Sequence, residues 1–129
     1  MSLDEYNAFC RSLPATTYVV QWRGSHVWKI GGKVFAVGSL NQEGQPAFTF
    51  KTSPLNFDFL SEQSGYRPAP YFASRGMKWI QQYHSTTETN TAETDEALRY
   101  YLSESYRIVS LGLSQRTQRA LGLNQTSSA

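Results

Sequence analysis

The chain has 129 residues, of which 40% are hydrophobic and 14% aromatic, so it can form one domain with a packed core and is not expected to be disordered. One cysteine, Cys10, excludes an internal disulfide, and with two histidines no Cys/His cluster has the spacing of a zinc site, so we expect neither a metal nor a cofactor. With neither an apolar run of about 18 residues nor a basic leader, we expect a cytoplasmic protein with no membrane association.

The formal net charge of +2 hides an uneven distribution of charge along the chain. No acid lies between Glu5 and Glu43, and none lies in residues 63–87, although both stretches carry basic side chains. The acids that follow the second stretch are gathered in residues 88–96. Two acid-free windows therefore coincide with the predicted sheet, and this pattern favours a basic surface on it.

The first predicted element is a helix that begins close to residue 2. Ser2 and Glu5 have the spacing of a capping box, and apolar residues recur at helical spacing until Pro14. The apolar stripe is expected to lie against the sheet, so Cys10 is predicted to be a buried small hydrophobe and not a nucleophile. Residues 1–3 are compatible with a vector-derived start and carry little weight in this prediction.

Four antiparallel strands are predicted next because β-branched and aromatic residues alternate with turn residues. Gly31 and Gly32 tolerate the positive φ that a type I′ hairpin turn requires. Phe48 and Phe50 point to one face of the last of these strands, whereas Lys51 points to the other. One face is therefore expected to be covered by helices and the opposite face to be open. The four strands span residues 17–22, 26–30, 33–40 and 46–51.

The second half of the chain is predicted to add helices to this sheet. Ser53 and Pro54 suit the N-cap and first position of a helix, and Gly65 stands where that helix would end. Residues 67–72 contain too many prolines for a central strand and are expected to run along an edge. The other expected elements are a strand at 77–83, a threonine-rich mobile loop at 85–94, a long helix capped by Thr94 and ending near Gly112, a short helix within 113–122, and a frayed tail at 124–129.

The predicted fold class is α+β, with an antiparallel sheet and helices packed on one face, in a single domain over residues 1–123. Several specific residues occur at defined places in this order of elements. They are Gly32-Lys33-Val34-Phe35-Ala36, Lys51, Pro68, Trp79 and Ser105-Tyr106. With them, the stretch from about residue 3 to residue 113 resembles the YjbR/MmcQ family.

The resemblance implies a CyaY/frataxin-like two-layer sandwich and DNA binding, with β-hairpins as paired wings. It also implies that Phe35 lies in the core. It does not imply iron handling, because the acidic ridge used for iron in frataxin is represented here only by Asp4 and Glu5.

Nucleic acid is the first candidate partner. Basic side chains would meet phosphates in a weak, largely sequence-independent way, and an exposed Trp79 or Tyr71 would stack on a sugar or base. Surface lysines are also common solubilising groups, and Trp79 is more often a core residue than a stacking platform. The candidate nucleic-acid-binding residues are Lys29, Lys33, Lys51, Arg67, Arg75, Lys78 and Trp79.

Two other interpretations stay open. An enzyme is not expected, because no paired carboxylates, no nucleophile with a base and no metal ligands occur at interpretable spacing. His26 is expected to be a solvated strand residue, and Ser105 and Tyr106 are expected to serve packing. A protein-interaction or small-ligand module without catalytic activity would instead use an aromatic pocket. That pocket would be lined by Tyr71, Phe72, Trp79 and Tyr83.

Overall fold

The computed structural model describes residues 1–83 and 91–123. Most of the expected loop at 85–94 and the expected tail at 124–129 lie outside the described residues. The helices are α1 (Leu3–Ser12), α2 (Pro54–Ser61), α3 (Thr91–Leu111) and α4 (Gln115–Ala120), with a 3-10 turn η1 (Ala73–Arg75). The strands are β1 (Thr16–Gln21), β2 (Ser25–Ile30), β3 (Lys33–Leu40), β4 (Pro46–Lys51), β5 (Tyr66–Pro68) and β6 (Trp79–Gln82).

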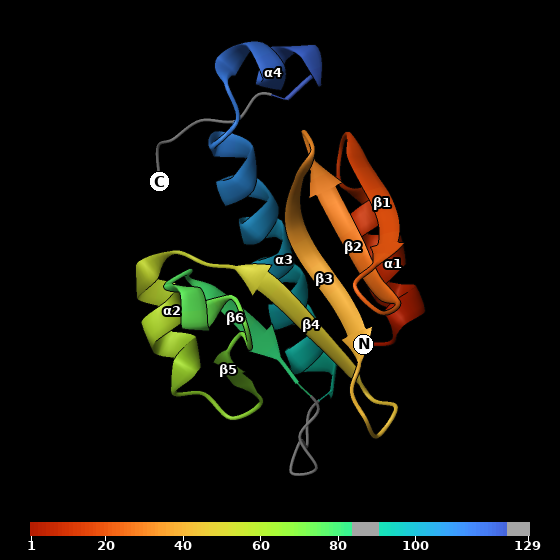
Figure 1. Cartoon of the computed structure of the whole chain (residues 1–129), viewed down its shortest axis with the longest axis vertical. Helices are drawn as coiled ribbons and strands as arrows, with labels where there is room; N and C mark the ends of the chain where they lie inside the picture. Colours follow the sequence, from red (N-terminus) through yellow and green to blue (C-terminus); the bar gives the residue numbers. More distant parts are fainter. Residues whose placement is uncertain (84–90, 124–129) are drawn as a thin grey trace.

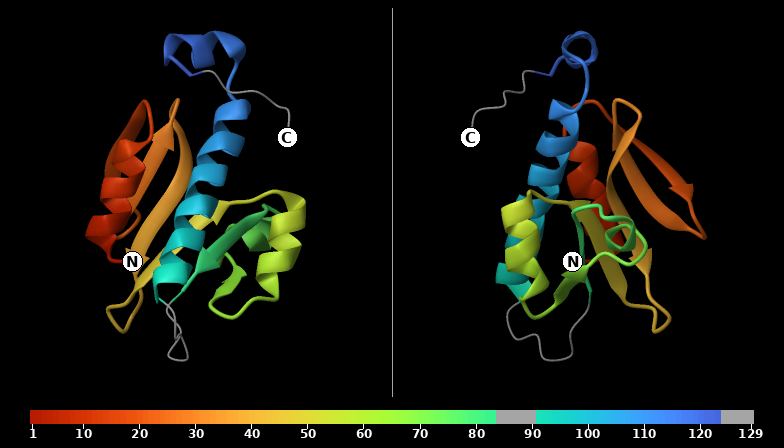
Figure 2. Two further views of the ribbon diagram at one scale, coloured as in Figure 1. Left: turned by 180° about the vertical axis from the view of Figure 1, so that it is seen from behind. Right: turned by 60° about the vertical axis from the view of Figure 1, so that its left-hand side comes forward.

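The strands form a six-stranded antiparallel sheet in the order β1-β2-β3-β4-β6-β5. Helix α1 packs against β1 and β3, and α3 packs across β2, β3 and β4. Both helices lie behind the sheet in Figure 1 and in front of it in the left view of Figure 2. The α+β class with an antiparallel sheet is therefore confirmed. Among the described residues, no helix has both the length and the apolar character needed to cross a membrane.

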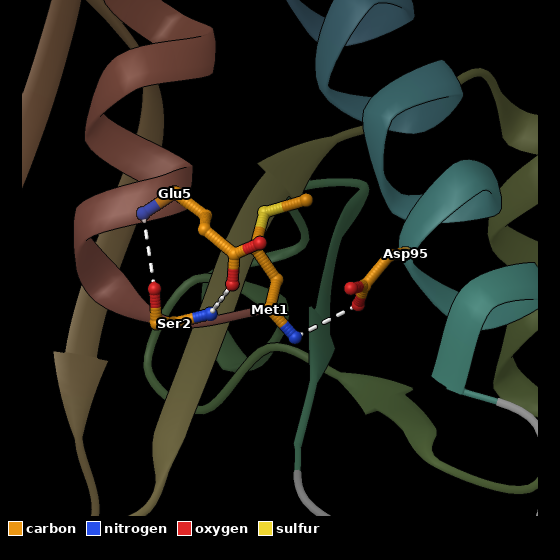
Figure 3. Close-up of polar contacts among 4 residues, drawn as sticks. All are labelled: Met1, Ser2, Glu5 and Asp95. Carbon is orange, nitrogen blue, oxygen red and sulfur yellow. Dashed lines mark hydrogen bonds and ion pairs between the residues drawn. The ribbon is translucent and has the colours of Figure 1, made fainter.

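The capping box predicted at the start of α1 is present. The Ser2 hydroxyl accepts a hydrogen bond from the Glu5 N–H at 3.1 Å, and the Ser2 N–H donates to the Glu5 carboxylate at 2.9 Å (Figure 3). The Met1 ammonium group forms an ion pair of 2.8 Å with Asp95 on α3. These contacts satisfy donors at the helix start and join α1 to α3.

The turn between β2 and β3 has the predicted backbone. Gly31 and Gly32 have φ values of 59° and 80°, the left-handed conformation in which glycine carries no steric penalty. A side chain at Gly31 would also meet Leu113, because an added Cβ would lie 2.6 Å from its Cδ1. Gly32 is therefore needed only for the turn, whereas Gly31 also leaves room for Leu113 in the chain that follows α3.

The core lies between the sheet and the helices. Phe48 and Phe50 face it as predicted, and Phe35 is fully buried with its ring edge against Tyr106 at 5.4 Å between centroids. The Tyr106 hydroxyl donates to the Pro14 carbonyl at 2.6 Å. Tyr106 therefore packs against the sheet and reaches a polar group at its edge, as its sequence position predicts.

Three predicted boundaries are wrong by a few residues. Helix α2 ends at Ser61 and not next to Gly65, because the N–H groups of Glu62 and Gln63 bond to carbonyls three residues earlier and tighten the chain into turns. Helix α3 begins at Thr91 and not at Thr94, because Ala92 and Glu93 continue the helical pattern backwards. Strand β6 begins at Trp79 and not at residue 77. Gly76, in the left-handed conformation, ends η1, so Met77 and Lys78 connect this turn to the strand and are not part of it.

The sheet face opposite the helices is open only in part. Strand β5 lies at the sheet edge, as the prolines predict, but the chain after Pro68 does not continue along that edge. Residues 69–76 fold over the face instead, and the Phe72 ring stacks on Trp79 with 4.8 Å between centroids. Val37 and Thr49, on this face of β3 and β4, are buried.

Candidate nucleic-acid interface

The register of the sheet decides which face each basic side chain takes. Trp28 and Ile30 of β2 belong to the core, so Lys29 between them points to the opposite face. Lys51 follows the buried Phe50 on β4 and takes the same face, as predicted. The helix-free face of the sheet therefore carries basic side chains on both β2 and β4.

A cavity of about 450 Å³ lies on this face and is named here the aromatic trough. Strands β3, β4 and β6 contribute its floor, and the β1–β2 turn with the start of β2 and the segment that follows β5 contribute its walls. Its volume lies in the range of small-molecule and cofactor sites. Its lining includes Trp22, Val37, Thr49, Tyr71, Phe72 and Gln81.

Trp22 and Tyr71 are the exposed aromatic walls of the trough. Trp22 is 54% exposed and Tyr71 is 67% exposed, although large aromatic side chains usually bury most of their surface. Both have positive φ, 53° at Trp22 and 73° at Tyr71, a conformation that bulky residues seldom adopt. The fold therefore holds two aromatic rings in solvent at some cost in backbone strain.

Arginine side chains accompany the aromatic rings on this face. The Arg75 guanidinium lies over the Tyr71 ring at 5.5 Å from its centroid, and the Arg67 guanidinium lies over Tyr83 at 4.9 Å. Arg67 also donates from Nε and Nη2 to the Gln81 amide oxygen, at 2.8 and 2.6 Å. These contacts hold planar cations in fixed positions, a geometry suited to phosphate groups.

A second cavity, of about 470 Å³, lies where the end of β4 leads into α2 and is named here the β4–α2 cavity. Three cations from distant parts of the sequence line it, namely Lys51, Lys78 and Arg107. The Lys78 ammonium lies over the ring of Phe57 at 4.8 Å, and Arg107 forms two hydrogen bonds to Glu104, at 3.0 and 3.1 Å. The Glu104 carboxylate raises the pKa of Arg107, which is therefore charged at every pH of interest.

The structure brings only some of the predicted site residues together. Lys51, Lys78 and Trp79 line the β4–α2 cavity, whereas Arg75 stands beside the trough. Arg67 lies on the edge strand β5 and lines a third cavity, of about 480 Å³, that it shares with the acidic Glu43. The two remaining lysines lie at the β2–β3 hairpin, Lys29 within β2 and the exposed Lys33 at the start of β3.

Trp79 is not an exposed stacking platform. It is only 4% exposed, because residues 69–76 cover it and Phe72 stacks on its ring. The aromatic pocket expected for a small-ligand module is also divided. Tyr71 and Phe72 line the trough, Trp79 lines the β4–α2 cavity and Tyr83 lines the cavity around Arg67.

Two residues of these sites were not predicted from the sequence. Trp22 was assigned only to a strand end, although a tryptophan directly before Arg23 and Gly24 in a predicted turn is a signal for an exposed ring. Arg107 lies in the middle of a long helix. A glutamate three residues earlier, Glu104, is typical of an ordinary surface pair, and only the packing of α3 places Arg107 at the end of β4.

Two candidate reactive groups are occupied by structural contacts. Burial raises the pKa of the Cys10 thiol far above its usual range, so the thiolate is scarce at neutral pH. His26 is half-buried and its Nδ1 lies 2.7 Å from the Tyr18 hydroxyl and 3.3 Å from the Asn7 amide nitrogen. His26 is therefore a strand residue with part of its surface in solvent, and α1 and β1 both reach its ring.

A family model matches most of this chain. A comparison with curated proteins finds no match. The family model described as YjbR matches residues 11–108, which extend from the last turn of α1 to the last turn of α3 and include every strand of the described residues. On this match the chain belongs to the YjbR family.

Proposed function

We propose that this protein binds nucleic acid, preferentially single-stranded, through the helix-free face of its sheet and without catalysing a reaction. The observation that carries the proposal is the aromatic trough, in which two exposed rings, Trp22 and Tyr71, stand in the walls of one cavity on a basic sheet face. Sheets that present aromatic rings and cations together are a recurring platform for single strands.

The aromatic rings would supply stacking. Each base stacked on an aromatic side chain contributes about 1 to 3 kcal/mol by alanine substitution, and stacking tolerates any sequence. Because the rings of Trp22 and Tyr71 are exposed, little of this gain would be lost to rearrangement. A duplex hides its bases, so the trough favours a single strand over a duplex.

The basic residues would supply phosphate contacts. Arg75 beside Tyr71 and the basic side chains on β2, β4 and β5 are distributed over the same face. Most of the acidic residues are remote from these strands in the sequence. Such contacts position a backbone without reading bases, so the proposed binding is weak and has little sequence preference. The candidate contacts are those of Lys29, Lys33, Lys51, Arg67, Arg75 and Lys78.

Salt dependence and two aromatic variants test the proposal. With fluorescein-labelled oligothymidylate and anisotropy as the readout, three to five neutralised phosphates give log affinity against log salt a slope of about −2 to −3.5. Trp22→Ala and Tyr71→Ala should each weaken binding by about five- to fiftyfold through lost stacking. Tyr100→Ala is the matched control, because Tyr100 is an exposed tyrosine on α3, and it should change affinity less than twofold.

Other outcomes have definite meanings. If the protein binds a duplex more tightly than a single strand, and if both aromatic variants keep that affinity, the trough is not the binding site. The binding would then be purely phosphate-directed, with contacts from the hairpins. No binding of either form at about 50 mM salt would reject a nucleic-acid function, because phosphate contacts are strongest at low salt. In that case the trough, with a volume of about 450 Å³, would be examined as a site for a small aromatic ligand.

A further inference from the structure

We propose that the β4–α2 cavity is a binding site for a phosphate monoester, separate from the aromatic trough. The inference does not depend on the proposed nucleic-acid function. Either a free phosphorylated small molecule or the terminal phosphate of a strand would present the same dianionic group. The proposal depends on three features of the cavity: its charge, an unpaired buried donor and its shape.

The charge of the cavity favours a dianion. Lys51 from β4, Lys78 from the segment before β6 and Arg107 from α3 line it together. No acidic side chain is among the residues that line it in the described part of the chain. Glu104 occupies Arg107 Nε and Nη2, whereas Arg107 Nη1 has no hydrogen bond within that part. Three cations around one space repel each other, and a dianion would relieve this repulsion.

Trp79 provides the second feature. Its side chain lines the cavity and is 4% exposed, yet its indole Nε1–H has no hydrogen-bond partner among the described residues. A buried indole N–H usually finds an acceptor, since an unsatisfied buried donor is costly. Trp79 Nε1 is the only buried side-chain N or O in the described residues without a partner. The Nε1 atom has no appreciable accessible surface, so a phosphate oxygen bound in the cavity would become its acceptor with a small shift of the side chains around it.

The walls of the cavity indicate an ester and not inorganic phosphate alone. Its volume of about 470 Å³ is several times that of a phosphate group, and Met77, Trp79 and Ile108 give it apolar surface. On another side stands the N-terminus of α2, where the Ser53 hydroxyl caps the Asn56 N–H and Pro54 occupies the first helical position. The helix dipole there adds positive potential without further free side chains.

Indole N–H resonances allow a direct test, because the chain has three tryptophans. Trp28 Nε1 already donates to Asn7, and Trp22 is exposed in the trough. In ¹H–¹⁵N spectra of the full chain, phenyl phosphate should move the Trp79 indole signal downfield in a saturable way, as expected for a new hydrogen bond. Trp79→Phe, which keeps the stacking on Phe72, assigns the signal by its disappearance.

Variants of the cations show whether the cavity is the site. Lys78→Gln and Lys51→Gln should each weaken phenyl phosphate about tenfold, since each removes one charge-assisted contact. Lys33→Gln is the matched control, because it removes an exposed lysine from a distant hairpin, and it should leave the affinity within twofold. Lys78 is exposed, so its variant is informative even if Trp79→Phe does not fold.

The proposal is overturned if phenyl phosphate moves no indole signal up to several millimolar. It is also overturned if phenol, which lacks the phosphate, shifts the Trp79 signal equally, or if all three lysine variants bind alike. Two further ligands distinguish the sources of the group. A 5′-phosphorylated oligothymidylate that shifts Trp79 when its 5′-hydroxyl counterpart does not would identify a strand end, and a shift with adenosine monophosphate alone would identify a free ester.

The outcome is independent of the trough. Trp22→Ala and Tyr71→Ala should leave phenyl phosphate affinity unchanged, because neither residue lines the β4–α2 cavity. Loss of oligothymidylate binding in these variants with retained phenyl phosphate binding would support both proposals. Loss of phenyl phosphate binding in the trough variants would contradict the separation of the two sites.

Discussion

The Ser105 hydroxyl on α3 accepts a hydrogen bond from the backbone N–H of Lys51 at the end of β4, at 2.9 Å. The same hydroxyl donates to the Phe35 carbonyl on β3, at 2.6 Å. The paired residues of β3 and β4 end at Ala36 and Phe50, so Phe35 and Lys51, the next residue of each strand at this end, are not paired with each other. One helix side chain therefore completes the hydrogen bonding where the central strands separate.

This arrangement predicts that Ser105→Ala destabilises the protein by about 2 to 4 kcal/mol, because two backbone groups lose their partners in a buried place. Urea unfolding followed by circular dichroism would measure the loss. Ser110→Ala is the matched control on the same helix. Its equally buried hydroxyl donates to the Tyr106 carbonyl, which keeps its helical partner, so the cost should stay below about 1 kcal/mol. Equal losses in the two variants would contradict a special role for Ser105.

Phe35→Ala should cost about 3 to 5 kcal/mol, because it empties a fully buried aromatic site and removes the edge contact with Tyr106. The midpoint of urea unfolding would fall accordingly. Phe59→Ala is the comparison, since that ring is exposed on α2, and it should change stability by less than about 1 kcal/mol. A loss below about 1 kcal/mol at Phe35 would place its side chain outside the core.

Gly38→Ala should destabilise the protein by about 1 to 3 kcal/mol through overpacking. Its φ lies outside the left-handed region, but an added Cβ would stand 2.5 Å from Cε2 of the buried Tyr6 ring. Thermal unfolding would report a lower Tm. Gly44→Asn should be nearly neutral, because nothing lies within 4 Å of a Cβ there and asparagine tolerates its φ of 80°. An unchanged Tm in Gly38→Ala would show that the Tyr6 ring moves aside freely.

The capping box predicts a dependence on pH at the start of α1. Hydrogen bonds from the Ser2 backbone N–H and then from its side chain lower the pKa of Glu5 below its ordinary value. The folded state thus favours the carboxylate, so the cap stabilises α1 above the unfolded pKa and weakens as pH falls through the folded pKa. The ¹³C chemical shift of the Glu5 carboxyl, followed against pH, would measure this.

Ser2→Ala keeps the backbone donor and removes the hydroxyl, so it should reverse the lowering of the Glu5 pKa only in part. Ser2→Pro removes both donors and should reverse more of the lowering of the Glu5 pKa, which leaves the smaller effects of the N-terminal ammonium group and Arg99. A titration that is the same in the natural sequence and in Ser2→Pro would show that the cap does not form.

Much of this fold is determined by short-range pattern in the sequence. The glycine pair at 31–32, the alternation around Phe48 and Phe50, and the capping box each involve residues within a few positions of one another. Turn geometry and side-chain alternation follow from local sterics, so the hairpins, the antiparallel sheet and the helix-facing side were all predictable. The CyaY/frataxin-like detail stays a prediction.

Only the tertiary structure shows how the helix-free face of the sheet is covered. No local rule tells whether a proline-rich segment continues along an edge or folds over a face, and here it folds over, which buries Trp79 and places Tyr71 in the trough with Trp22. Likewise Lys51 and Arg107 are 56 positions apart and share a cavity only because α3 crosses the end of β4. Both cavities depend on the packing of segments that are distant in the sequence. The contacts that stabilise this packing are not encoded by local sequence pattern.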